Sequence, residues 1–364
     1  MDTQQTIQNI VVFIVLLGGL VTVHELGHFI LAKRAGVRVE EFGIGFPPRL
    51  FAFRRGETEY SINAIPLGGF VRMLGEEDPT APRSFAAAAR WWRVAILAAG
   101  ATMNFVAAIL LFSAAYVAGW PTVTKSEVVI TEVVVDSPAA RAGLRPGDIV
   151  RSFGGATIGD STQLRDQIRG SVDKPATIIV SRAGADVSVE VTPRVAAPTD
   201  QAQIGVRIDD HPLKIEQIPY GFPAALTLGV GRTIQTILLT FSIPVLAIQH
   251  LIPAEVARPM GPVGIFQAVS QATTETASTG WWFPVLSLAA AISAGLGIAN
   301  LLPIPGLDGG RLLFVLIEAV RGRRISPRRE SMIHFIGLAF LVSMIVVVTY
   351  FDVLSPVNLD VPPR

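Results

Sequence analysis

The residues of this chain with the clearest potential for chemistry are His24, Glu25 and His28, in the run HELGH. Two histidines four positions apart lie on one face of a helix, about 6 Å apart along its axis, so they can share one metal ion. H-E-x-x-H on a helix is typical of two zinc ligands with a glutamate that acts as general base. The spacing alone is a weak signal. The alternative is that neighbouring helices satisfy these side chains without a metal.

The setting of this run strengthens the metal interpretation. It lies in an apolar stretch, about 10–32, that is longer than the roughly 20 residues needed to cross a bilayer. Charged groups cost roughly 2.5–3.5 kcal/mol each at the centre of a membrane helix, so an accidental cluster there would be rare. Of the 364 residues, 50% are hydrophobic and only 16% are charged, and the mean hydropathy is +0.49, which indicates an integral membrane protein.

Composition also excludes several kinds of site. The chain has no cysteine, so a metal must be bound by histidine, aspartate or glutamate. The formal net charge of +1, without a basic stripe, gives no indication of nucleic-acid binding.

A catalytic zinc site has three protein ligands and one open position, so a third ligand must come from elsewhere. The other histidines, His211, His250 and His334, stand in no recognisable motif. Asp308 is the better candidate. It lies in NLLPIPGLDGG, residues 300–310, where two prolines and three glycines at the end of an apolar span force the backbone out of a helix and can direct a carboxylate inward. The alternative is a solvated aspartate in a cytoplasmic turn.

Charge placement predicts the membrane topology. Lysines and arginines follow the first span and recur in RGRRISPRRE at 321–330, which places both loops in the cytoplasm. The domain at 120–214 is then outside, so the chain crosses an odd number of times between it and 321–330. Two apolar segments lie there, and the one at about 224–250 is interrupted by Arg232, Gln235 and Pro244. We expect that segment to be interfacial or re-entrant.

The sequence therefore predicts a polytopic α-helical membrane protein with about four transmembrane helices. The N-terminal membrane part is 1–119 and the C-terminal membrane part is 215–364, and the expected spans are about 10–32, 94–119, 281–305 and 333–350. Residues 120–214 alternate in the manner of β-strands, with one helix-like stretch at 161–170. Within them, SPAARAGLRPGDIVRSFGG resembles the PDZ domains of bacterial proteases, and any small β-rich domain is the alternative.

Several motifs together resemble the site-2 protease family of intramembrane zinc metalloproteases, of the bacterial RseP/RasP type. HELGH matches the family's first motif, NLLPIPGLDGG matches Asn-x-x-Pro-x-Pro-x-Leu-Asp-Gly, and GATMNF at 100–105 is similar to Gly-x-x-x-Asn. Two runs within about 38–75 resemble the family's membrane-associated β-hairpin, and GPVGI at 261–265 resembles the segment before its third span. The chain departs from some relatives in having room for a single PDZ domain.

The resemblance implies one Zn²⁺ per chain, with His24, His28 and Asp308 as ligands and Glu25 as general base. It also implies substrate binding by a hairpin edge strand near Ile62, Asn63 and Ala64 and by Asn300 with Pro305, and support of the site by Asn104 and Gly100. An ordinary cytoplasmic hairpin, and amides that only pack helices together, are the alternatives for these residues.

The expected partners are the lipid bilayer and single-pass membrane proteins that another protease has already shortened, such as anti-sigma factors or remnant signal peptides, with no nucleic acid. The expected location is the bacterial inner membrane, with both termini and the PDZ domain extracytoplasmic and the active site toward the cytoplasm. A catalytically silent adaptor whose PDZ domain binds C-termini is the rival, although an adaptor needs none of the four site residues.

Overall fold

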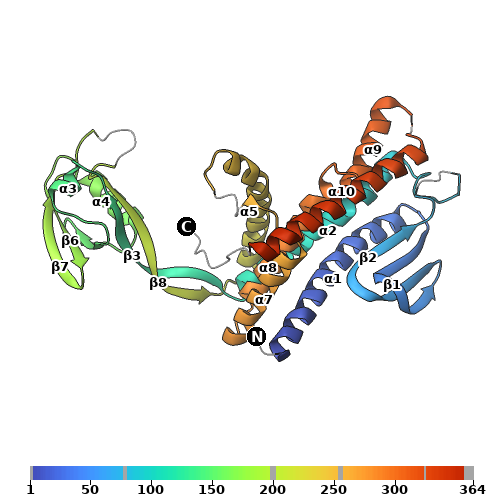
Figure 1. Cartoon of the computed structure of the whole chain (residues 1–364), viewed down its shortest axis with the longest axis horizontal. Helices are drawn as coiled ribbons and strands as arrows, with labels where there is room; N and C mark the ends of the chain where they lie inside the picture. The colour runs from blue at the N-terminus through green and yellow to red at the C-terminus, as the bar shows by residue number, and fades with distance from the viewer. Residues whose placement is uncertain (1–2, 77–79, 197–201, 253–256, 324, 356–364) are drawn as a thin grey trace. The chain divides into compact units, whose positions relative to one another are not determined.

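The computed structural model describes residues 3–76, 80–196, 202–252, 257–323 and 325–355. It divides into two compact units: residues 1–119 with 219–364, and residues 120–218 (Figure 1). The two chain termini, for which we predicted an extracytoplasmic position, lie outside the described residues.

The first unit is built from long apolar helices. Five described helices are long and apolar enough to cross a membrane: α1 (Thr3–Arg34), α2 (Arg90–Val117), α5 (Phe222–Ile248), α8 (Phe283–Leu301) and α10 (Pro327–Leu354). Two more, α7 (Pro262–Thr279) and α9 (Asp308–Arg321), were not expected from the sequence. With 32 residues, α1 is about 48 Å long, more than enough for a bilayer. The chain is an integral membrane protein.

Small residues let the helices of this unit pack closely around α2. A Cβ on Gly27 of α1 would lie 2.7 Å from the carbonyl carbon of Ala99, so α1 and α2 touch through their backbones there. On the other side of α2, the Ser293 hydroxyl of α8 donates to the backbone carbonyl of Asn104 at 2.8 Å. These contacts hold α1 and α8 on either side of the same stretch of α2.

Helices α5 and α8 begin at the same end of the unit. The N–H of Tyr220, just before α5, donates to the carbonyl of Tyr116, and the indole N–H of Trp281, just before α8, donates to the carbonyl of Gly119. In the sequence between α5 and α8, helix α7 runs along the first half of α1 and returns the chain to this end. Because α5 leaves this end and α7 returns to it, the pair adds no net crossing before α8. By length and composition α5 could itself span, so our interfacial or re-entrant assignment of about 224–250 stays a prediction.

Strands β1 (Val39–Arg55) and β2 (Thr58–Met73) form one two-stranded sheet that folds back on itself. A tight turn at Gly56, with φ +64°, joins them. The first half of β1 pairs with both halves of β2: Phe42 has Tyr60 on one side and Val71 on the other.

This fold-back shows that the predicted edge was wrong at Ile62. Ile62 pairs with Ile44 and also with Phe51, so strand neighbours cover both of its sides, and Asn63 pairs with Arg49. Ala64 has no strand partner in this pairing of the described residues, so substrate binding at Asn63 and Ala64 stays a prediction. Among the described residues, one outer edge of this sheet is instead Gly69–Met73, which pairs only with the first half of β1.

The second unit is a small β-rich domain. Its strands run in the order β7-β6-β4-β3-β8, with β5 beside β4. Their bounds are β3 Trp120–Val133, β4 Ile149–Phe153, β5 Ala156–Thr157, β6 Ala176–Arg182, β7 Ala185–Val191 and β8 Val206–Ile218, and the helices are α3 Pro138–Arg141 and α4 Ser161–Gly170. Alternating residues such as Val128, Ile130, Ile178 and Val180 fill a core with Leu164 of α4. Its assignment as a PDZ domain at 120–214 stays a prediction.

Candidate metal centre

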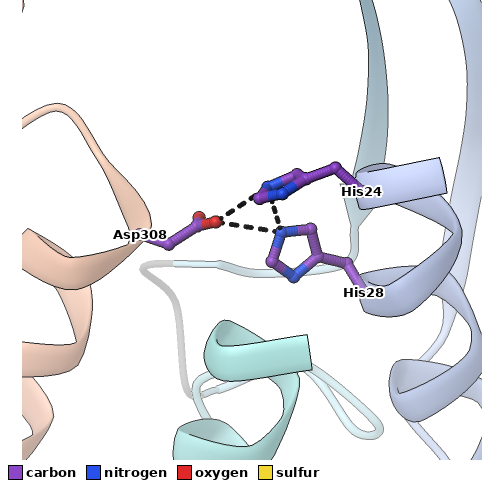
Figure 2. Close-up of side chains that lie close together, drawn as sticks. All are labelled: His24, His28 and Asp308. Atoms are coloured by element: carbon purple, nitrogen blue, oxygen red, sulfur yellow. Dashed lines mark hydrogen bonds and ion pairs between the residues drawn. The ribbon is translucent and has the colours of Figure 1, made fainter. Parts of the chain in front are cut away.

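Helix α1 presents two imidazoles toward one point. His24 and His28 are one turn apart and nearly buried, and their Nε2 atoms lie 3.1 Å from each other. Both side chains project toward the start of α9 (Figure 2).

Asp308 reaches the same point from the other half of the chain. It is the first residue of α9, and its Oδ2 atom lies 3.0 Å from the Nε2 atoms of both His24 and His28. All three candidate ligand atoms lie within 4.8 Å of one another. The structure thus brings together the three residues that the sequence nominates, although 280 positions separate His28 from Asp308.

Two glycines make the presentation of Asp308 possible. The chain turns at Pro303–Leu307, the loop between α8 and α9, so that the start of α9 packs against this loop. Within the turn, Gly306 has φ +100°, a conformation that favours glycine. A Cβ on Gly309 would lie 2.6 Å from the carbonyl carbon of Leu301, and one on Gly310 would lie 2.9 Å from that of Ile304. Any side chain at 309 or 310 would push α9 away from the loop, and Asp308 would move with it.

Hydrogen bonds on the outer nitrogens fit a metal-binding arrangement of the rings. The Nδ1–H of His28 donates to the carbonyl of Ile96 at 2.7 Å, so its Nε2 carries a lone pair that faces Asp308. For His24 the outer neighbour is the amide of Asn104, 3.2 Å from Nδ1, and the Oδ1 atom of Asn104 has no hydrogen-bond partner among the described residues. With that amide turned by 180°, Oδ1 accepts from the His24 Nδ1–H.

The resulting donor set suits zinc. Two imidazole Nε2 atoms and a carboxylate oxygen face one point, and their lone pairs repel one another unless a metal ion or a shared proton lies between them. Gly100 of α2 leaves the space beside it, because a Cβ there would lie 2.6 Å from the Nε2 atom of His24 and closer still to that of His28. Two histidines with one carboxylate are a ligand set of catalytic zinc sites.

Glu25 lines a cavity beside this point. The cavity has a volume of about 250 Å³, and His28, Asp308 and Val71 also line it. Val71 lines the cavity together with Glu25, and the backbone of β2 passes the Glu25 side chain at Gly69. A carboxylate placed beside the three ligand atoms can act as a base on a water molecule in the cavity.

The residues predicted to bind substrate are not among those that line this cavity. The side chain of Asn300 donates to the carbonyl of Leu296 in its own helix, and that of Asn63 donates to the carbonyl of Gly45. Neither is among the residues that line the cavity, and the same holds for Ile62, Ala64 and Pro305.

The lining residues that the sequence analysis did not single out include Val71, Glu76 and Arg311. Arg311 donates to Glu76 at 2.7 Å, which links α9 to the end of β2. A signal for Arg311 existed, since it stands three positions after Asp308, on the same helix face.

Comparison with known proteins identifies the family. Residues 12–344 match the sequence model of peptidase family M50. The chain belongs to peptidase family M50. Among curated M50 relatives, "Zinc metalloprotease RasP" of Bacillus licheniformis is 31% identical over 95% of this chain and 98% of its own length. "Regulator of sigma-W protease RasP" of Bacillus subtilis is 30% identical with the same coverage, and the Geobacillus kaustophilus RasP is 32% identical over 96% and 98%.

As an M50 peptidase of the site-2 type, the chain is an intramembrane zinc metalloprotease. The solved structure of the PDZ domain of an SdrC-like protein from Listeria monocytogenes is 22% identical over 24% of this chain and 92% of its own, with a TM-score of 0.22. That score is too low to assign the fold of the second unit.

Proposed function

We propose that this chain cuts peptide bonds within the transmembrane segments of single-pass membrane proteins, with His24, His28 and Asp308 as ligands of one Zn²⁺ and Glu25 as general base. The observation that carries the proposal is the convergence of three ligand atoms within 4.8 Å beside a cavity that Glu25 lines. Zinc bound there would supply Lewis acidity, which activates water and polarises a carbonyl.

The chain's own groups then perform the proton transfers. Glu25 accepts a proton from water as the water oxygen bonds to the substrate carbonyl carbon, and it passes that proton to the leaving amine nitrogen as the C–N bond breaks. Val71 lines the same cavity and lies at the edge where the substrate backbone is proposed to bind. On the ligand side, Ile96 and Asn104 fix the rotation of the two imidazole rings.

The Gly69–Met73 edge, which has a strand partner on one side only, is our proposed binding site for the substrate backbone. A transmembrane helix shields its carbonyls in hydrogen bonds, so a substrate must unwind before cleavage, and its freed groups then need partners. Val71 and Met73 line the cavity, and because the Met73 N–H already donates to Glu76 at 3.4 Å, a substrate would pair with the remaining backbone groups of this edge. An unwound segment added to this edge would lie beside Glu25. This replaces the edge that we predicted at Ile62.

Orientation and substrates complete the proposal. The positive residues that follow α1 and precede α10 support a zinc site toward the cytoplasm and a second unit outside, where a PDZ domain would filter substrates that another protease has shortened. The name of the Bacillus subtilis relative, a regulator of a sigma factor, favours anti-sigma factors as one substrate class. Because the chain has no cysteine, single introduced cysteines and membrane-impermeant maleimides can test this orientation without background.

Purified protein and one purified single-pass substrate test the proposed mechanism. We expect about one zinc per chain in the wild type, and cleavage that Glu25→Gln abolishes while zinc remains bound. His24→Ala and Asp308→Ala should lose both zinc and cleavage, and Glu59→Gln, on the hairpin, is a control that should retain both. Equal cleavage by wild type and Glu25→Gln would overturn the assignment of the base. Full zinc binding by His24→Ala would overturn the assignment of the site.

A further inference from the structure

Asp352 is a buried carboxylate near the end of α10, although the last turns of this helix otherwise expose large apolar side chains. Its residue surface is only 1% exposed. One oxygen, Oδ2, accepts a hydrogen bond from the N–H of Gly264 at 2.8 Å, and the other, Oδ1, lies 3.6 Å from the guanidinium of Arg258. A buried charge at this place needs such partners, because an unpaired one would be strongly destabilising.

GPVGI at 261–265, a motif without a role in the zinc site, forms the binding site for the Asp352 carboxylate. Gly264 is the third residue of α7, in the first turn, where N–H groups lack helical partners and the helix dipole favours an anion. A Cβ on Gly261 would lie 2.8 Å from the Asp352 Oδ2 atom, and one on Gly264 would lie 3.1 Å from it. The two glycines therefore admit the carboxylate to the start of α7.

Arg258 makes the converse contact at the end of α10. Its guanidinium donates to the carbonyl of Phe351 at 3.1 Å and to that of Ser355 at 2.8 Å. These carbonyls belong to the last turn, where a cation is favoured. The start of α7 and the end of α10 are thus joined by an anion and a cation, each placed at the helix end that favours it. We refer to Asp352, Arg258, Gly261 and Gly264 as the clasp.

The first half of α10 contacts the loop that delivers Asp308. A Cβ on Gly337 would lie 2.5 Å from the Cβ of Pro305, and the N–H of Gly306 donates to Nδ1 of His334 at 3.0 Å. Between this contact and the clasp, the surface of α10 is largely exposed, as Val346 at 63% illustrates. The helix is therefore fixed mainly at the clasp and at the Pro305–Gly306 loop.

We propose that Asp352 is a positioning residue for the zinc ligand Asp308: the clasp fixes α10, and α10 in turn holds the Pro305–Gly306 loop from which Asp308 projects. The inference rests on the proposed role of Asp308 as a ligand. In this proposal GPVGI anchors the end of α10, and α10 acts as a brace, a fixed support for the metal centre.

Zinc affinity, measured by competition with a chelator, is the primary readout because it does not depend on cleavage. We expect Asp352→Ala in the full chain to weaken zinc binding about tenfold, the lower range seen when a group that orients a ligand is removed. Val346→Ala, on the exposed face of the same helix, should leave the affinity unchanged. Wild-type zinc affinity in Asp352→Ala would overturn the inference.

A disulfide rescue separates lost positioning from simple misfolding. In the Asp352→Ala background, Gly261→Cys and Val348→Cys place two thiols within bonding reach, because a Cβ on Gly261 would lie 3.1 Å from Cγ1 of Val348. Oxidation should restore the zinc affinity and the cleavage rate, and reduction should remove both again. Failure of the oxidised protein to regain zinc would contradict the brace. Failure of the proposed function is distinct, since it would appear as full zinc binding in His24→Ala.

Discussion

Gly100 lies against the imidazole of His24, and a Cβ on this glycine would lie only 2.6 Å from the His24 Nε2 atom. The space that a metal ion needs is therefore provided by a missing side chain on α2. No conformational freedom is involved, since Gly100 sits inside a regular helix.

Gly100→Ala should weaken zinc binding at least about tenfold, because the added methyl group displaces an imidazole from its ligand position. Alanine is otherwise favoured over glycine inside a helix by roughly 1 kcal/mol, so the variant should not unfold for reasons of propensity. Gly19→Ala in α1 is the matched control, since nothing lies within 4 Å of its Cβ. Undiminished zinc affinity in Gly100→Ala would show that the ion does not bind at this point.

Asn104→Ala should weaken zinc binding about 10- to 100-fold, because the His24 ring loses the amide that fixes its rotation. Chelator competition measures this effect. Ser293→Ala removes a neighbouring hydrogen bond that ends on the Asn104 backbone, and it should leave the affinity near that of the wild type. Equal affinities in the two variants would place Asn104 among residues that only pack α2 against α8.

Val71→Pro should leave the sheet folded but reduce cleavage at least about tenfold. Proline is tolerated on a strand edge, and it removes a backbone N–H at the cavity that Glu25 lines, where the substrate backbone is proposed to bind. Zinc content should not change. Ile62→Pro is the contrasting variant, since this residue has strand partners on both sides and the hairpin should be disrupted. Wild-type cleavage by Val71→Pro would exclude this edge from catalysis and from substrate binding.

A buried ion pair should control the stability of α9. Nη2 of Arg93 donates to both carboxylate oxygens of Glu318 at 2.8 Å, and both side chains are more than 90% buried. Glu318→Ala leaves the Arg93 charge buried without this partner and should lower the free energy of unfolding by about 3–5 kcal/mol. Asp166→Ala, which removes an exposed partner of Arg169, should change it by less than about 1 kcal/mol. Denaturant titration in detergent micelles measures the free energy of unfolding of wild type, Glu318→Ala and Asp166→Ala.

The second unit should lose stability in acid through Asp148. Burial of this side chain acts to raise its pKa, but hydrogen bonds from Arg182 and from the Arg145 N–H outweigh that effect and hold the pKa below its usual range. The stabilisation is therefore complete above the unfolded pKa, near 3.9, and is lost as the pH falls through the lower folded value.

Asp148→Asn should accordingly lower the free energy of unfolding of this unit by about 1–3 kcal/mol at pH 7, and the difference from wild type should shrink below about pH 4. Unfolding curves at pH 7, 5 and 3 test this. A gap that stays constant down to pH 3 would mean that the charge of Asp148 contributes nothing.

The sequence was informative where a local pattern has one chemical meaning. Once HELGH is helical, the four-residue spacing places His24 and His28 on one face. The prolines and glycines around Asp308 indicate where the chain must turn. The strand alternation at 127–136 and 176–184 likewise predicts β3 and β6, because one face must be buried. Each of these inferences depends on residues close together in the chain.

The errors and omissions came from contacts between distant segments. Nothing local in YSINAIPLGG shows that Ile44 will cover the second side of Ile62, since that depends on how β1 folds back. The start of α7 was read only as a motif because its partner, Asp352, comes 88 residues after Gly264. Helix α9 was overlooked because its apolar residues follow a glycine pair and precede an arginine-rich run, a context typical of a loop.

The second unit is connected to the membrane helices through the paired ends of β3 and β8. Strands β3 and β8 pair from Trp120 opposite Ile218, and just outside them the N–H of Tyr220 bonds the carbonyl of Tyr116. The chain thus departs from the membrane helices and rejoins them at adjacent positions. Because its two ends are adjacent, a domain inserted in this way can be exchanged, duplicated or deleted during evolution without changing the path of the helices that carry the catalytic groups.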